Sequence, residues 1–342
     1  MLLFVSSVLS SLLMIRMSIY LTRAFSIVDN PDDAHKLHDE STPFVGGIGV
    51  LITLFVALVV LVNNHSDLFY KCMVLGICSV AIFVTGFVDD AIKLSYKPRF
   101  IAQAIVAFIM VIAGGVVLND FGDLLFGLSL QLGFFAIPIT IFAVIGGINA
   151  INMIDGIDGL AGGMSLVILL TVAGFLTFTG HGTSVMEPLI IVAAIVPFLA
   201  FNLSWKGFKG NKIFMGDAGS MFVGLTIVWL LVDHTQGETA AFRPITAVWL
   251  VGLPLMDMAA IMYRRARKGQ SMLKPDRQHL HNIFMRAGLS SRKSLVAILC
   301  LGACYCLIGI LGEVYQVPEA VMFWGFMGLL VIYSLVIQHI WS

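Results

Sequence analysis

The sequence predicts an all-α integral membrane protein with about eleven transmembrane helices, its N-terminus outside the cell and its C-terminus in the cytoplasm. Of its 342 residues, 59% are hydrophobic and only 12% are charged, which leaves too little polar surface for a soluble chain of this length. Apolar runs approaching the ~20 residues that a helix needs to cross a bilayer recur along the chain. Basic residues gather in alternate connections between these runs, and this alternation sets the orientation.

Eleven apolar runs account for most of the chain. They cover residues 2–22, 46–63, 70–88, 101–118, 132–148, 160–179, 188–204, 217–233, 244–263, 295–313 and 319–338. No period of 20–50 residues repeats, which argues against a solenoid. We therefore predict a single polytopic membrane domain over residues 1–342, in which residues 264–294 form a cytoplasmic loop rich in basic residues and histidine.

Lysine and arginine fix the orientation because basic loops stay in the cytoplasm. The odd-numbered connections contain Arg23, Lys36, Lys93, Lys97, Arg99, Lys206, Lys209, Lys212, Arg264, Arg265, Arg267, Lys268, Lys274, Arg277, Arg286, Arg292 and Lys293. The even-numbered connections contain only Lys71 and Arg243. This bias places every odd-numbered connection on the cytoplasmic face.

The aspartates near the ends of the predicted spans fall on that same face. They are Asp89, Asp90, Asp155, Asp158 and Asp217. Any one of them could cap a helix or pair with a lysine, but five on one membrane face favour a shared site. Their oxygens suit Mg²⁺ or Mn²⁺, and a cation would relieve the repulsion between neighbouring carboxylates.

Two further features point to phosphate. The segment "FMGDAGS" (214–220) opens a predicted span, and a helix N-terminus offers free N–H groups and a positive dipole end. The segment "DRQHLH" contains Arg277, His279 and His281, which we interpret as phosphate or pyrophosphate contacts. A zinc site remains an alternative for the His-x-His pair, although no cysteine accompanies it. The zero net charge argues against a nucleic-acid partner.

Hard-metal ligands, phosphate donors and a membrane location together predict phosphoryl transfer to or from a lipid. A cation-coupled transporter is the alternative from another class. Transporter acids usually lie near the middle of the bilayer, whereas most of these acids flank spans at the cytoplasmic edge.

The motifs and their order resemble those of the polyprenyl-phosphate N-acetylhexosamine-1-phosphate transferase superfamily. They are "VDNPDDAHKLHDESTPFVGG" (28–47), "FVDD", "NAINMIDGIDGL", "NKIFMGDAGS", "PLMDMAAIMYRRARKG" and "DRQHLHNIFMRAG". The chain is most similar to the bacterial branch that uses UDP-GlcNAc. The resemblance implies transfer of GlcNAc-1-phosphate to undecaprenyl phosphate with release of UMP, the first membrane step of O-antigen or enterobacterial common antigen synthesis. Another UDP-HexNAc or phospho-MurNAc-pentapeptide remains open as donor.

The resemblance also implies roles for particular residues. Asp89 and Asp90 match the paired aspartates associated with catalysis, metal and the lipid phosphate, and Asp155 and Asp158 match those associated with catalysis and the nucleotide sugar. Asp217 matches the aspartate that holds Mg²⁺ or Mn²⁺. The substrate-binding residues implied are Asn152, Arg265, Arg277, His279, His281, Lys36 and His38.

Two further positions are Asn282, where the sequence departs from the family pattern, and Asp257. The family's histidine motif usually ends in two adjacent histidines, but Asn282 follows His281 here. Asp257 lies within a predicted span, where an acid has either a functional role or a structural hydrogen bond to a neighbouring helix. The implied location is the bacterial cytoplasmic membrane, and a homodimer is left open.

Overall fold

Apolar helices make up most of the chain, as predicted. The computed structural model describes residues 2–25, 46–64, 69–182, 184–208, 211–237, 240–271 and 279–341. Its helices are α1 (Leu2–Phe25), α2 (Gly46–Asn64), α3 (Phe69–Ile92), α4 (Tyr96–Ile112), α5 (Ala136–Ile154), α6 (Leu160–Phe178), α7 (Met186–Asn202), α8 (Gly216–Asp233), α9 (Pro244–Leu250), α10 (Gly252–Arg267), α11 (Leu280–Arg286), α12 (Ser291–Val314) and α13 (Glu319–Trp341), with a short 3-10 turn, Gly133–Phe135, before α5.

Several of these helices can cross a membrane. Within the described ranges, six helices have the necessary length and apolar composition, and α9 with α10 adds a seventh if this pair, bent by 76°, is one span. Shorter apolar stretches lie in α1, α2 and α7. The chain is therefore a multi-pass membrane protein, and each of the eleven predicted runs overlaps a helix or a helix pair.

The outer helices expose the apolar side chains that a lipid environment requires. Val5, Leu9, Leu13 and Met17 recur every four residues along α1 and are each 47–60% exposed. Such a stripe on a soluble protein would be a large exposed apolar patch. When this stripe faces lipid, its apolar side chains avoid the free-energy cost of contact with water.

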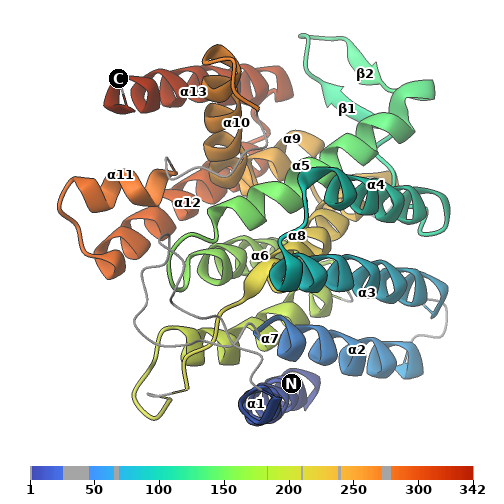
Figure 1. The fold of residues 1–342 in the computed structure, drawn as a ribbon. Helices are drawn as coiled ribbons and strands as arrows, with labels where there is room; N and C mark the ends of the chain where they lie inside the picture. The colour runs from blue at the N-terminus through green and yellow to red at the C-terminus, as the bar shows by residue number, and fades with distance from the viewer. Residues whose placement is uncertain are drawn as a thin grey trace.

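Helix α8 is the centre of the packing. Ala218 through Val232 are all buried, and α8 packs mainly against α3 and α5. Figure 1 shows α8 between these helices, with α1 and α2 at one side and α10 and α13 at the other. Because α8 is apolar all round, it fits only inside a bundle, and this position places its N-terminus among the ends of other helices.

Two sequence-based boundaries are wrong in ways that affect the site. Asn149 and Asn152 belong to the last turns of α5, not to the connection that follows the fifth span. The predicted span 244–263 is broken at Val251, where α9 ends and α10 begins at an angle. Apolar composition alone marks neither feature.

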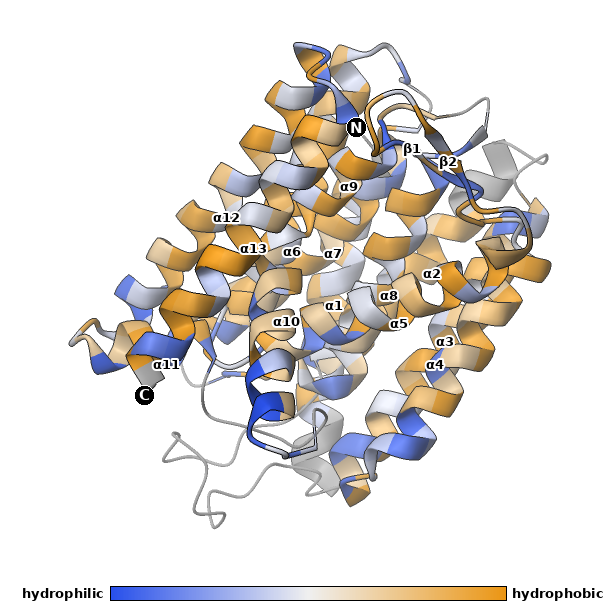
Figure 2. Ribbon diagram, turned by 90° about the horizontal axis from the view of Figure 1, so that it is seen from above, coloured by the Kyte–Doolittle hydropathy of each residue, from blue (hydrophilic) through white to orange (hydrophobic). Residues whose placement is uncertain are grey.

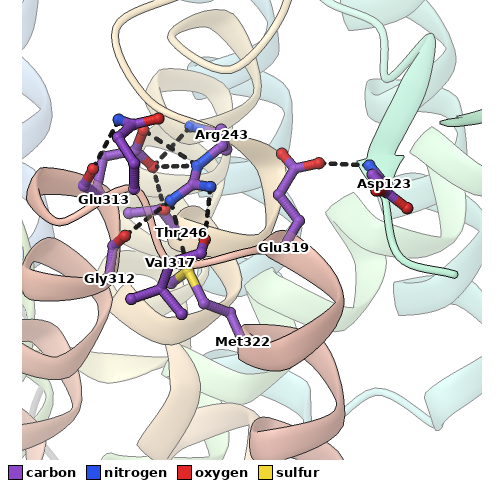
Figure 3. A network of polar contacts seen from close by, with 9 residues as sticks. Asp123, Arg243, Thr246, Gly312, Glu313, Val317, Glu319 and Met322 are labelled. Atoms are coloured by element: carbon purple, nitrogen blue, oxygen red, sulfur yellow. Dashed lines mark hydrogen bonds and ion pairs between the residues drawn. The ribbon is translucent and has the colours of Figure 1, made fainter. Parts of the chain in front are cut away.

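The fold also contains a small antiparallel sheet that an all-α prediction misses. Strands β1 (Asp120–Asp123) and β2 (Ser129–Gln131) pair with Asp120 opposite Gln131. Strands of four and three residues are too short to give a recognisable alternation. Glu319 at the start of α13 accepts a hydrogen bond from the Asp123 backbone N–H, as Figure 3 shows.

A second polar network lies beside this hairpin. Arg243 Nε lies 3.1 Å from Glu313 Oε2, and Thr246 also donates to that carboxylate. The Arg243 guanidinium donates further to the carbonyl oxygens of Gly312 and Val317 (Figure 3). The network ties α9, α12 and α13 together at the end of the bundle that contains the hairpin.

Candidate functional site

The predicted site segments meet at the other end of the bundle. Figure 2 shows hydrophilic residues around the end of α10 and the nearby ends of α3 and α4, opposite β1 and β2. Contacts described below join the end of α3, the beginning of α4, the end of α5 and the beginning of α8, and the end of α10 lines the same cavity as Arg99 and Asn152. The structure therefore brings together residues that are more than a hundred positions apart in the sequence.

Asp90 binds the N-terminus of α8. Its Oδ1 accepts from the Asp217 backbone N–H at 2.9 Å, and its Oδ2 accepts from the Ala218 N–H at 3.1 Å. A carboxylate in this position satisfies N–H groups that have no partner within the helix and interacts favourably with the helix dipole. Asp90 therefore fixes where α8 begins and holds Asp217 in place.

Gly216 makes this contact possible. Its φ of +70° is a left-handed conformation that suits glycine, and a Cβ at this position would lie 2.6 Å from Asp90 Oδ2. The glycine of "FMGDAGS" thus allows the α3 carboxylate to reach the backbone of α8.

Asp89, the buried neighbour of Asp90, joins a cluster with Arg99, Asn152 and Asp217. Arg99 Nη1 lies 2.6 Å from Asp89 Oδ2 and 3.8 Å from Asp217 Oδ2, while Nη2 donates to Asn152 Oδ1 at 3.1 Å. Asn152 Nδ2 donates to Asp217 Oδ1 at 2.7 Å and to Ser220 Oγ at 2.9 Å. The Arg99 guanidinium and the Asn152 amide therefore connect α3, α4 and α5 to the start of α8.

Arg99 is the site residue that sequence reasoning missed. The sequence predicts for it only a role in orienting the spans, as one of the seventeen basic residues of the odd-numbered connections. Its position in "KPRF", at the start of α4, resembles that of an ordinary loop anchor. Only the three-dimensional arrangement shows that its guanidinium turns inward to the carboxylates.

Asp155 and Asp158 do not share a helical face. Asp155 follows the last residue of α5 with ψ of 59°, and residues 155–159 form a turn before α6. Asp158 forms an ion pair with Lys212 at 2.7 Å, in which both side chains are about one-third exposed. The two acids are thus presented by a turn, and the second already has a cationic partner.

Asp155 is an exposed residue, but neighbouring protein atoms still remove part of the hydration of its carboxyl group. This desolvation, followed by the negative charges of Asp217, Asp158 and Asp90, raises the pKa of Asp155 to about 7. The direction is that expected of carboxyl groups gathered without a counter-ion. A cation near Asp155 would favour its ionised form.

The histidine segment is anchored to α10. His279 Nδ1 lies 3.0 Å from Asp257 Oδ2, and Asp257 Oδ1 accepts from the Leu280 N–H at 3.1 Å. The rings of His279 and His281 are parallel, with centroids 5.8 Å apart. The hydrogen bonds of Asp257 therefore attach the histidine segment to α10.

His281 connects this segment to the second acidic motif. A Cβ on Gly156 would lie 1.9 Å from His281 Cε1, so only a glycine lets the ring pack there. Burial and the charge of His279 lower the pKa of His281 to about 4, which leaves the ring neutral at physiological pH. Asn282 Nδ2 lies 3.0 Å from His281 Nε2, so the residue that replaces the family's usual histidine holds its neighbour in place.

An apolar cavity of about 910 Å³ opens onto this cluster. Polar side chains of Arg99, Asn152, Arg265 and His279 line part of it, while Phe121 and Leu124 of the hairpin region line another part. Helices α5, α8, α10 and α13 supply most of the remaining wall. The cavity thus combines an extensive hydrocarbon surface with a small group of cationic and amide donors.

The residues present fit a hard divalent cation by their chemistry. Asp217 is 38% exposed at its side chain, and the Asp89 carboxyl lies within hydrogen-bonding reach of it. Among the described residues, no three histidine, cysteine or acidic side chains already form a metal-binding group. Both oxygens of Asp90 accept from α8 and Asp89 faces Arg99, so Asp217 is the carboxylate of the three whose side chain remains accessible to a cation.

Three predicted substrate contacts cannot be placed. Lys36, His38 and Arg277 lie outside the described residues. Arg265 is buried in the last turn of α10 and lines the same cavity as His279. Arg265, His279, Asn152 and Asp217 therefore lie at one end of the protein. The contacts of Lys36, His38 and Arg277 with substrate stay predictions.

Comparison with known proteins finds transferases of the kind that the sequence motifs resemble. Residues 72–235 match the model of glycosyl transferase family 4. The chain is 38% identical to the undecaprenyl-phosphate alpha-N-acetylglucosaminyl 1-phosphate transferase of Salmonella typhi, over 98% of this chain and 92% of the relative. It is 38% identical to the protein of the same name from Haemophilus influenzae, over 92% and 87%, and 37% identical to that of Yersinia pestis, over 92% and 85%.

Proposed function

Because the chain belongs to glycosyl transferase family 4, we propose that it transfers GlcNAc-1-phosphate from UDP-GlcNAc to undecaprenyl phosphate. The products are undecaprenyl-diphospho-GlcNAc and UMP. This reaction starts O-antigen or enterobacterial common antigen synthesis in the bacterial cytoplasmic membrane. The names of the relatives support the choice of donor and acceptor.

The observation that carries the proposal is the junction of the apolar cavity with the charged cluster. A polyprenyl chain requires a long hydrocarbon surface, and its phosphate requires cationic donors at one end of that surface. Arg99, Arg265 and His279 line the cavity at this end, and we propose that they contact such a phosphate or the diphosphate of the donor. The carboxylates Asp89, Asp155 and Asp217 lie where a hard cation would offset their charge.

In the proposed reaction, an oxygen of the lipid phosphate attacks the sugar-bearing phosphorus. The bond from that phosphorus to the bridging oxygen breaks, and the oxygen leaves with UMP. A phosphate monoester has a second pKa near ~6 and is already mostly ionised at neutral pH. The protein therefore has to position two anions and reduce their repulsion more than it has to remove a proton.

Each residue then has a defined task. Arg265 and His279 bind the diphosphate, and Asp89 positions the lipid phosphate or accepts its residual proton. Asp155 and Asp158 face the nucleotide sugar. Mg²⁺ or Mn²⁺ held by Asp217 and Asp89 would supply further neutralisation of the diphosphate charge.

The direct test is incubation of the purified protein with UDP-GlcNAc, undecaprenyl phosphate and Mg²⁺ in detergent. Release of UMP with formation of a diphospholipid supports the transferase, since detergent abolishes the compartments that a transporter needs. Parallel assays with UDP-GalNAc and UDP-MurNAc-pentapeptide test the donor. Absence of UMP release with every donor would contradict the proposed function.

Direct displacement predicts no exchange of label between UMP and UDP-GlcNAc until the lipid is added. The experiment uses lipid-stripped enzyme, labelled UMP and unlabelled UDP-GlcNAc, and follows label entering the nucleotide sugar. Rapid exchange without lipid, abolished by Asp89→Asn, would instead reveal a sugar phosphate bound covalently to the enzyme.

We also propose eleven spans with the N-terminus outside and the C-terminus in the cytoplasm, on the basis of the distribution of basic residues. In a cysteine-free variant, single cysteines at Ile92 and Gln270 are expected to react in intact cells only with membrane-permeant reagents. A cysteine at Tyr315, which is 75% exposed at the hairpin end of the bundle, is expected to react with an impermeant reagent. The reverse pattern would invert the orientation.

A further inference from the structure

Asp257 is a buried acid within α10 that receives three hydrogen bonds from other parts of the chain. Its Oδ2 lies 3.0 Å from His279 Nδ1, and its Oδ1 accepts from the Leu280 N–H at 3.1 Å and from the Tyr333 hydroxyl at 2.9 Å. Only 3% of the residue is exposed. Since a carboxylate inside a membrane protein is costly unless satisfied, these donors account for its burial, and they connect α10 to α11 and α13.

The hydrogen bond fixes which nitrogen of His279 is available to a substrate. An ionised carboxylate can only accept, so the short contact to Asp257 requires a hydrogen on Nδ1 of the imidazole. Nε2 is then the nitrogen left to the cavity, which His279 lines together with Arg99 and Arg265. The parallel ring of His281 restricts rotation of His279 on one side.

We propose that Asp257 is a positioning residue for the transfer reaction, holding His279 so that Nε2 meets the phosphate groups of the substrate. This inference rests on the proposed function. Asp257 does not itself touch substrate: it accepts from Nδ1–H, fixes the ring orientation and stabilises an imidazolium whose Nε2–H can donate to a phosphate oxygen, as carboxylates do for histidines in other enzyme sites.

The chemistry of asparagine makes Asp257→Asn a specific probe. The native carboxylate accepts from His279 with one oxygen and from the Leu280 N–H with the other. An amide has one acceptor oxygen, so its NH₂ group must face either Nδ1 or the backbone N–H. If it faces Nδ1, that nitrogen must accept and the ring can no longer be an imidazolium with an N–H on both sides, and if it faces Leu280, the start of α11 loses its anchor. Either outcome disturbs His279 while the volume is conserved.

The test is a double-variant cycle on the purified enzyme in detergent, with kcat and KM measured for both substrates. We expect Asp257→Asn to lower kcat about 10- to 100-fold, the usual range for loss of a partner that orients a functional histidine. The double variant Asp257→Asn with His279→Gln should fall within about twofold of His279→Gln alone, because the carboxylate acts through this ring. Tyr333→Phe is the matched control, since it removes one donor to the same carboxylate and spares the bond to His279, and it should retain activity within about threefold.

Additive losses in the cycle, or a Tyr333→Phe loss equal to that of Asp257→Asn, would overturn the inference and leave Asp257 a packing residue. If Asp257→Asn cannot be recovered folded, as judged by its Tm in detergent, Asp257→Glu replaces it. This variant keeps the charge, so we expect higher activity than from other substitutions and the same non-additivity with His279→Gln. Failure of the unmodified enzyme to release UMP would contradict the proposed function instead, so the two failures are distinguishable.

Discussion

Replacing Asp217 by Asn is expected to lower kcat at least ~100-fold, the cost typical of removing one preorganised electrostatic group from an active site. The variant keeps the size of the side chain and an oxygen that can still accept from Asn152 Nδ2, a bond of 2.7 Å in the native protein. The fold should therefore survive, and the loss should come from the missing charge. If Asp217 holds the cation, the concentration of Mg²⁺ needed for half-maximal rate should also rise.

The measurement is UMP release as a function of Mg²⁺ concentration, with the Tm of each variant recorded in the same detergent. Asp120→Asn makes the same chemical change in the hairpin at the opposite end of the bundle and should leave both quantities unchanged. Near-normal activity with an unaltered Mg²⁺ dependence in Asp217→Asn would remove Asp217 from the proposed metal site.

The sequence predicts much of this site because its motifs lie at the ends of apolar runs. Once the basic residues have assigned a face to each connection, Asp89, Asp155 and Asp217 must lie on the same side of the membrane. Asn152 donates to the Asp217 carboxylate and the Asp217 N–H donates to Asp90, so the segments that contain Asn152 and Asp90 both meet the segment that contains Asp217. What the alternation of loops cannot give is the distance between clusters, because it fixes only the side of the membrane and not the neighbours within the bundle.

The role of Asp90 illustrates this limit. The sequence pairs Asp89 with Asp90, and similar side chains in adjacent positions suggest similar tasks. On a helix, however, neighbouring residues point about 100° apart. Asp89 consequently meets Arg99 while Asp90 meets the backbone of α8. That one of two adjacent aspartates pairs with an arginine while the other caps a helix depends on this geometry.

Local hydropathy does not report the features that the sequence misses. They are the break at Val251, the helical position of Asn152 and the hairpin at Asp120, and the hairpin depends on contacts with distant segments. Glu319 and Gln236 hold the hairpin through its backbone, and both are separated from it by more than a hundred residues. Short strands of this kind have little intrinsic stability, so their presence depends on contacts that no local pattern contains.

Replacing Arg99 by Gln is expected to reduce activity by about 100-fold or more, and this prediction tests the residue that only the structure identifies. Arg99 is the guanidinium between Asp89 and Asp217, and it also donates to Asn152. Without it, Asp89 stays buried with no counter-charge, a situation more costly than losing an exposed ion pair. The remaining carboxylates would repel the incoming phosphates, and the cavity would lose one of the donors at its polar end.

Kinetics of two matched variants separate these effects from a loss of folding. Arg99→Lys keeps the charge but loses the planar fork that contacts an aspartate and an amide together, so we expect it to fold normally with intermediate activity and a raised KM for undecaprenyl phosphate. Lys97→Gln removes a positive charge two residues earlier on the same helix, from an exposed side chain, and should change kcat by less than about twofold because exposed charges in water are well screened. Equal and small losses in Arg99→Gln and Lys97→Gln would mean that the positive charge of Arg99 serves membrane topology alone. A large loss confined to Arg99 would support a catalytic arrangement in which one arginine holds the aspartates of two motifs in register with the end of the lipid cavity.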